Sequence, residues 1–149
     1  MPVMDGLSAT RAILEEFPDA RIIVLTTYTG DEDIHRALDA GAMGYLVKDM
    51  MVPEVLTAIR QVMAGRRGIP PVVAATLAEH TPRIALTPRE IEVISLMSAG
   101  LTNAQIASRI GRTEETVKVH VKNILQKLDA RDRTAAVTIA VRRGFIRLA

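Results

Sequence analysis

The 149-residue sequence contains no cysteine and no tryptophan, and only 3% of its residues are aromatic. Without cysteine, disulfide bonds and thiolate metal sites are excluded. Three histidines, His35, His80 and His120, are too scattered to suggest a metal cluster. No apolar run reaches the roughly 18 residues that span a bilayer, and no secretion signal begins the chain. We therefore expect a cytoplasmic protein without a metal or other cofactor.

Charge is divided unevenly along a chain of otherwise ordinary globular composition. Residues 1–82 contain 7 Lys and Arg against 11 Asp and Glu, whereas residues 83–149 contain 12 against 6. The first part is therefore acidic and the second basic. A basic module is typical of a domain that binds phosphates, although a solvated basic face would give the same count.

The acidic part alternates between helix and strand patterns. Short apolar runs at 21–26 and 44–47 are typical of buried parallel strands. Helical patterns precede, separate and follow these runs, around 7–17, over 31–40 and from 53 to 65. This order predicts two parallel strands with right-handed crossovers and three helices on the faces of the sheet, over residues 1–66.

A cluster of helix-breaking residues, Gly65-Arg-Arg-Gly-Ile-Pro-Pro71, coincides with the change in charge. We place the domain boundary there and interpret residues 67–83 as a linker that can hold a short helix over 72–79.

From residue 84 to residue 149 the pattern is helical throughout. Helix-capping side chains are expected at four positions, Thr87, Thr102, Thr113 and Asp132. They predict helices over about 88–99, 103–110, 114–128 and 133–143. The second and third of these helices, with a turn centred on Gly111, form a helix-turn-helix unit.

The longer helix of this unit, Glu114 to Leu128, has two distinct faces. One is an apolar stripe made of Val117, Val121, Ile124 and Leu128. The opposite face contains Lys118, Val119, Lys122, Asn123 and Gln126. In a major groove the lysines can donate to guanine or phosphate, and Val119 can meet a thymine methyl.

Three polar residues near helix starts, Asn103, Thr113 and Thr116, suit contacts to DNA phosphates. Taken alone, Lys118 and Lys122 also fit an ordinary solvated face. We expect these two lysines to lack an acidic partner at the i, i+4 spacing and to repel each other slightly, a repulsion that DNA would relieve.

These segments together resemble the LuxR/NarL/FixJ-type DNA-binding domain. The matching stretches are Leu86-Thr-Pro-Arg-Glu-Ile-Glu-Val-Ile94, Gly100-Leu-Thr-Asn-Ala-Gln-Ile-Ala107, Glu115 to Leu128 and Arg133 to Val137. The resemblance covers roughly residues 84–147. It implies sequence-specific binding to promoter DNA as a homodimer, with Lys118, Val119 and Lys122 at base-contacting positions. In that family the last helix also contributes to the dimer contact. Its small apolar residues here would allow that contact, although they would equally suit an ordinary intramolecular core: Ala135, Ala136, Ile139 and Ala140.

The acidic part resembles the receiver domain of a two-component response regulator. Met1-Pro-Val-Met-Asp-Gly6 is similar to the segment that follows the phosphorylated aspartate of receivers. By the same resemblance, Thr26 is the switch hydroxyl, Tyr45 the coupled aromatic and Lys48 the lysine that pairs with the phosphoaspartate.

The family's phosphoacceptor aspartate and magnesium-binding acidic residues would lie upstream of Met1, and Asp5 does not replace them. Mg²⁺ and a cognate sensor histidine kinase are therefore expected only for an intact receiver. We expect residues 22–25 to form an apolar strand edge. We also expect Met1 to be an internal methionine of a longer reading frame, or the gene to be truncated.

The leading hypothesis is thus a non-enzymatic transcription regulator of a phosphorelay, built from an α/β receiver remnant and an all-α helix-turn-helix domain. Two alternatives are a helical protein-interaction module and a sigma-factor-like module. A third is an α/β enzyme using Asp5, Thr26 and Lys48, which is disfavoured because no nucleophile-base pair or phosphate-binding glycine loop accompanies these residues.

Overall fold

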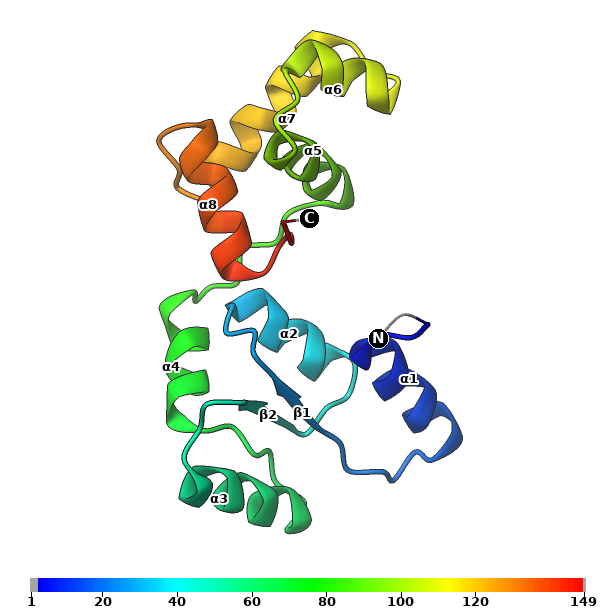
Figure 1. Ribbon diagram of the computed structural model, residues 1–149, viewed down its shortest axis with the longest axis vertical. Helices are drawn as coiled ribbons and strands as arrows, with labels where there is room; N and C mark the ends of the chain where they lie inside the picture. The colour runs from blue at the N-terminus through cyan, green and yellow to red at the C-terminus, as the bar shows by residue number, and fades with distance from the viewer. Residues whose placement is uncertain (1–2, 149) are drawn as a thin grey trace. The chain divides into compact units, whose positions relative to one another are not determined.

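The computed structural model describes residues 3–148, which divide into two compact units with the boundary between His80 and Thr81 (Figure 1). Each unit is described by itself. Met1 and Pro2 of the receiver-like motif lie outside the described residues.

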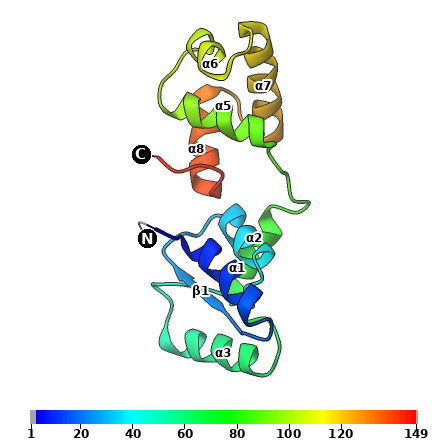
Figure 2. The same ribbon diagram turned by 90° about the vertical axis from the view of Figure 1, so that its right-hand side faces the viewer.

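The first unit is built around a two-stranded parallel sheet. Its elements are α1 (Gly6–Glu16), β1 (Ile23–Thr26), α2 (Asp31–Asp39), β2 (Gly44–Val47), α3 (Val52–Met63) and α4 (Pro71–Glu79). The strands pair in register from Ile23 opposite Gly44 to Thr26 opposite Val47. Helices α1 and α2 lie on one side of the sheet and α3 on the other (Figures 1 and 2). This arrangement confirms the predicted order of two parallel strands and three helices.

The segment after α3 covers the outer edge of β2. The backbone N–H of Gly68 donates to the Met43 carbonyl at 2.8 Å, and its carbonyl accepts from Tyr45 N–H at 3.3 Å. A Cβ atom at Gly68 would lie 2.6 Å from the carbonyl oxygen of Ala58, so only glycine permits this close approach. Between residues 3 and 148, no further strand pairs with the free edge of β1.

The segment interpreted as a linker is largely folded. Helix α4 occupies residues 71–79, and its Val73 is buried with Ile34, Ala37 and Tyr45 in the core of the first unit. The first compact unit therefore extends to His80, well past the breaker cluster at 65–71. Burial of Val73 against α2 explains why this short segment holds a helix, since isolated short helices are marginal in water.

Much of the apolar surface of α1 and α3 remains exposed. The exposed fractions are 43% for Ile13, 59% for Phe17 and 69% for Met63. Thr10 on α1 and Val62 on α3 are buried. The small sheet therefore covers only one stripe of each helix.

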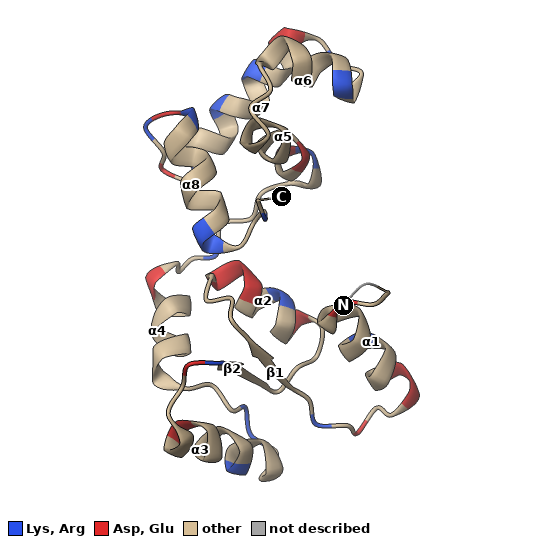
Figure 3. Ribbon diagram, in the orientation of Figure 1, with Lys and Arg blue, Asp and Glu red and all other residues tan. Residues whose placement is uncertain are grey.

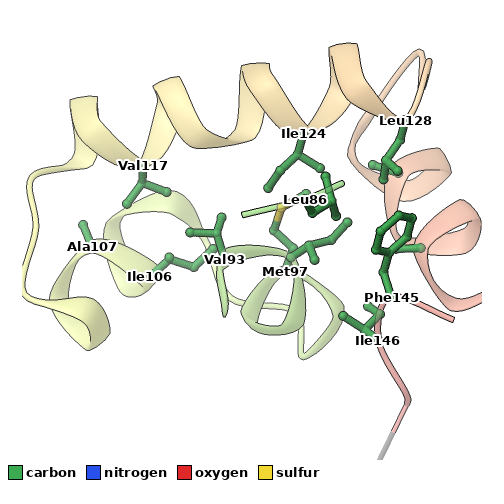
Figure 4. Close-up of a cluster of buried hydrophobic side chains, with 13 residues drawn as sticks. Leu86, Val93, Met97, Ile106, Ala107, Val117, Ile124, Leu128, Phe145 and Ile146 are labelled. Atoms are coloured by element: carbon green, nitrogen blue, oxygen red, sulfur yellow. The ribbon is translucent and has the colours of Figure 1, made fainter. Parts of the chain in front are cut away.

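The second unit contains four helices: α5 (Pro88–Ser98), α6 (Asn103–Ile110), α7 (Glu114–Lys127) and α8 (Arg133–Arg143). Their inward side chains form one core, in which Val93, Ile106 and Val117 meet at one end, and Leu128 and Phe145 lie at the other (Figure 4). The predicted four-helix domain is confirmed.

The helix starts follow the capping chemistry of the sequence. Thr87 accepts from Glu90 N–H at 3.1 Å while the Glu90 carboxylate accepts from Thr87 N–H at 2.8 Å. Thr102 and Gln105 form the same reciprocal pair. Gly111 ends α6 in the left-handed conformation, with φ of 67°, which permits the tight turn into α7.

Candidate nucleic-acid interface

Helices α6 and α7 form the helix-turn-helix unit, and α7 is anchored by one face. Val117 and Ile124 are fully buried and Leu128 is 5% exposed. Figure 4 shows Val117 and Ile124 pointing from α7 into the core beside Val93 and Leu86. The opposite face of α7 is therefore directed away from the core.

The outward face of α7 carries the side chains that the sequence analysis assigned to DNA bases. Lys118, Val119 and Lys122 are exposed, Val119 to 57%. Beside them runs a shallow groove lined by Asn103, Lys118, Val121, Lys122, Leu125, Gln126, Asp129 and Ala130. Lys and Arg positions also mark α6 and α8 (Figure 3). This unit thus combines a projecting helix with positive charge, as phosphate neutralisation requires.

Lys118 has an acidic partner three residues away, whereas the expectation concerned only partners four residues away. Its Nζ lies 3.0 Å from Oε1 of Glu115, three residues earlier on α7. The hydrogen bond and charge of Glu115, with the charge of Glu114, raise the pKa of Lys118 above its ordinary value. The expected repulsion between Lys118 and Lys122 is therefore offset in the free protein, because one of the two lysines already has a counter-ion.

The polar residues assigned to phosphates already have partners within the unit. Thr113 caps α7 by accepting from Thr116 N–H at 3.2 Å, and the two hydroxyls lie 2.9 Å apart. The oxygen of Asn103 accepts from Arg133 at 2.7 Å, and this hydrogen bond does not use the amide NH2 group, which is a donor. Thr113 and Thr116 lie at the start of α7, beside the α6–α7 turn, whereas Asn103 lies at the start of α6.

Arg133 links α8 to the start of α6. Besides Asn103 it donates to the backbone carbonyl of Leu101, and burial lowers the pKa of its guanidinium. This contact holds the first turn of α6, and with it Asn103, at the edge of the groove.

The last helix is less available for a dimer contact than the resemblance implied. Ala136 and Ala140 are completely buried in the core of their own unit, so these two residues cannot contribute a dimer surface. Ala135 and Ile139 are half-buried and keep part of their surface outside. The small side chains at 136 and 140 serve instead to let α8 approach the core closely.

In the first unit, the structure brings two of the three receiver-like residues together. Thr26 ends β1 and Lys48 follows β2, and Lys48 N–H donates to the Thr26 carbonyl at 2.9 Å. Tyr45 is 2% exposed and its hydroxyl donates to the Tyr28 carbonyl at 2.7 Å. The buried side chain of Tyr45 thus points from β2 into the core of the first unit.

Asp5 has a structural role at the start of α1. Its carboxylate accepts from Ser8 N–H at 2.7 Å, and this backbone hydrogen bond lowers the pKa of Asp5. Within residues 3–148 no three His, Asp or Glu side chains come close enough to hold a metal ion. The residues present therefore do not fit the magnesium site of an intact receiver.

Comparison with known proteins assigns a family to both units. Residues 85–140 match the family model for bacterial regulatory proteins of the luxR family, and residues 1–60 match that for the response regulator receiver domain. The uncharacterized transcriptional regulatory protein YxjL of Bacillus subtilis strain 168 is 38% identical, over 98% of this chain and 72% of YxjL. The transcriptional regulatory protein LiaR of the same strain is 36% identical, over 98% of this chain and 73% of LiaR. This chain belongs to the LuxR-type response regulators.

YxjL and LiaR are both named as transcriptional regulatory proteins, and this chain is a transcription regulator of the same family. A solved structure of two RcsB dimers bound to two parallel DNAs has the same fold, with a TM-score of 0.63 and 25% identity. The structural match covers 93% of this chain and 68% of the RcsB chain. No helix between residues 3 and 148 of the regulator is both long and apolar enough to cross a membrane.

Two charged pairs that involve α7 were not predicted from the sequence. The Nζ atom of Lys127 donates a hydrogen bond to Oε2 of the buried Glu90 at 2.9 Å. The two residues are 37 positions apart in the sequence, and no spacing rule predicts such a contact. The pair of Glu115 and Lys118 was readable, because side chains three residues apart on a helix are neighbours.

Proposed function

We propose that this chain regulates transcription by placing α7 in the major groove of double-stranded promoter DNA. One observation supports this most strongly: α7 is fixed by fully buried Val117 and Ile124 while Lys118, Val119 and Lys122 project from its other side. A helix held in this way presents its outward side chains in a fixed geometry, which base recognition requires.

Each outward side chain has a distinct role in the proposal. Lys118 and Lys122 donate to guanine O6 and N7, and Val119 packs against a thymine methyl. Thr113 and Thr116 at the start of α7, with the amide of Asn103 at the start of α6, contact phosphates and set the register on the duplex.

The active DNA-bound form is proposed to be a homodimer, like the RcsB dimers in the DNA-bound structure. The partly exposed Ala135 and Ile139 on α8 remain available for that contact, whereas the buried Ala136 and Ala140 do not. Sedimentation of the chain on a single selected duplex measures the number of protomers, and one protomer per complete site would contradict the proposal.

Regulation is proposed to take place in the cytoplasm, where bacterial promoter DNA is located. DNA binding itself needs no cofactor in this proposal, so chelation of divalent ions should leave it unchanged. Phosphotransfer from a sensor histidine kinase, and Mg²⁺ with it, would require an intact receiver; Thr26, Tyr45 and Lys48 would then act as its switch residues.

Binding is tested by selecting duplexes from random DNA with the full chain and measuring affinity at several salt concentrations. Lys122→Ala should weaken binding to a selected site more than to unrelated DNA, because it removes a base contact. Arg89→Ala is a matched control: it removes one positive charge from α5, where Arg89 is already paired with Glu92 at 2.7 Å.

Equal loss on all sequences after Lys122→Ala would reassign Lys122 to a phosphate contact. If the chain bound no duplex even in dilute buffer, the proposal would be wrong and a helical protein-interaction module would be favoured. Binding without a steep salt dependence would contradict phosphate neutralisation.

A further inference from the structure

Glu115 lies at the centre of the face that the lysines share. At 100° per residue it is about 20° from Lys122 and about 40° from Val119 around the axis of α7. Its side chain is 82% exposed. Since Glu115 is in the first turn of α7 and recognition helices contact base edges through their N-terminal residues, it would enter the groove together with Lys118.

A carboxylate at position 115 can accept hydrogen bonds from only some of the groups that DNA presents. An ionised carboxylate only accepts hydrogen bonds, so the phosphate backbone repels it. In the major groove, the exocyclic N4 amine of cytosine is the donor that Glu and Asp side chains read. The neighbouring Lys118 ammonium, 3.0 Å away, is a donor suited to guanine O6 and N7.

We propose that Glu115 is a base-reading residue that selects a cytosine next to the guanine contacted by Lys118. The proposal rests on the proposed placement of α7 in the major groove. The Glu115 carboxylate is an acceptor and the Lys118 ammonium is a donor, and the two lie side by side on α7. In the major groove, the amine of cytosine and the acceptors of guanine likewise lie side by side, in one C·G pair or in two successive pairs. The ion pair with Lys118 orients the carboxylate before DNA arrives.

Glu114 supplies a matched control on the same helix turn. Both glutamates are exposed, and both lie in the first turn of α7, where each interacts favourably with the helix dipole. Glu114 is rotated by about 100° from Glu115, toward the flank of the helix. Glutamine at either position removes one negative charge from the same region, but only Glu115→Gln removes the carboxylate from the centre of the face.

The test is selection from a random duplex library with the full chain, its E115Q variant and its E114Q variant, followed by competition binding on single-base variants of the selected site. We expect one cytosine per half-site whose preference falls by roughly tenfold in Glu115→Gln, with adenine gaining because glutamine reads adenine. Glu114→Gln should keep the cytosine. Both variants should bind unrelated DNA somewhat more tightly, because each lacks a charge that repels phosphates.

Three results would overturn the proposal. Unchanged base preferences in Glu115→Gln, with a uniform gain on all sequences, would leave Glu115 as a counter-ion of Lys118 while the proposed function of α7 stands. The same change of preference in Glu114→Gln would show a general charge effect. If the parent chain selects no sites at all, the proposed function fails and this inference with it.

Discussion

The two units of this chain differ in how completely their apolar side chains are covered. In the second unit, four short helices enclose Val93, Ile94 and Ile106 with no exposure at all. In the first unit, Phe17 at the end of α1 and Leu25 of strand β1 are more than half exposed. Helices can close a core with their own side faces, whereas a parallel sheet needs covering layers on both faces and a neighbour at each edge. Stability should therefore be concentrated in the second unit.

The largest difference in unfolding free energy is expected when one isoleucine from each unit is replaced by alanine. Ile124→Ala empties a completely buried site beneath α7 and should lower the free energy of unfolding of the second unit by about 3 kcal/mol. Ile13→Ala removes a side chain that is 43% exposed on α1 and should cost less than about 1 kcal/mol. Amide hydrogen exchange followed by mass spectrometry distinguishes the two units. Equal losses would show that the first unit is as well packed as the second.

A smaller effect is expected from the ion pair between the buried Glu90 and the partly exposed Lys127 of the second unit. Burial alone would raise the pKa of Glu90, but the hydrogen bonds from Lys127 and Thr87 and the Lys127 charge outweigh burial and lower it. The unfolded chain therefore binds a proton at a higher pH than the folded chain. The stabilisation is complete above the unfolded pKa, about 4.3 for glutamate, and is lost as the pH falls through the lower folded pKa.

Glu90→Gln should make the stability of the second unit less dependent on pH below about 5 and reduce it at neutral pH by about 2 kcal/mol. Thermal unfolding followed by circular dichroism between pH 3 and pH 7 measures both changes. Glu92→Gln is the control, because Glu92 lies on the same helix with its side chain 49% exposed. A pH profile unchanged by Glu90→Gln would show that other carboxylates govern the acid transition.

The local elements were predictable from the sequence because short-range chemistry specifies them. The threonine caps of α5, α6 and α7 and the glycine at position 111 marked these helices within a few residues. Helical periodicity predicted the buried Val117, Ile124 and Leu128, whereas Val121 of the same stripe is only half-buried. On the receiver side, the apolar runs identified both strands and their parallel pairing.

The remaining features depend on contacts between distant segments. Arg133 meets Asn103 across 30 residues, and neither side chain indicates its partner. The alanines of α8 suit a core and a dimer surface equally well, so only packing assigned Ala136 and Ala140 to the core. Helix α4 has little amphipathic pattern, and its place is fixed by the burial of Val73 against α2.

The smallest effect is expected from removing one partly buried hydrogen bond of the less covered first unit. Tyr45→Phe removes the hydroxyl that donates to the Tyr28 carbonyl and should destabilise this unit by about 1 kcal/mol. Thr57→Val removes an exposed hydroxyl that donates within α3 and should change stability by at most a few tenths of a kcal/mol. Hydrogen exchange over residues 23–47 reports the difference. If both variants behaved alike, Tyr45 would contribute only the packing of its ring, and the loop after β1 would be held by the chain's other contacts.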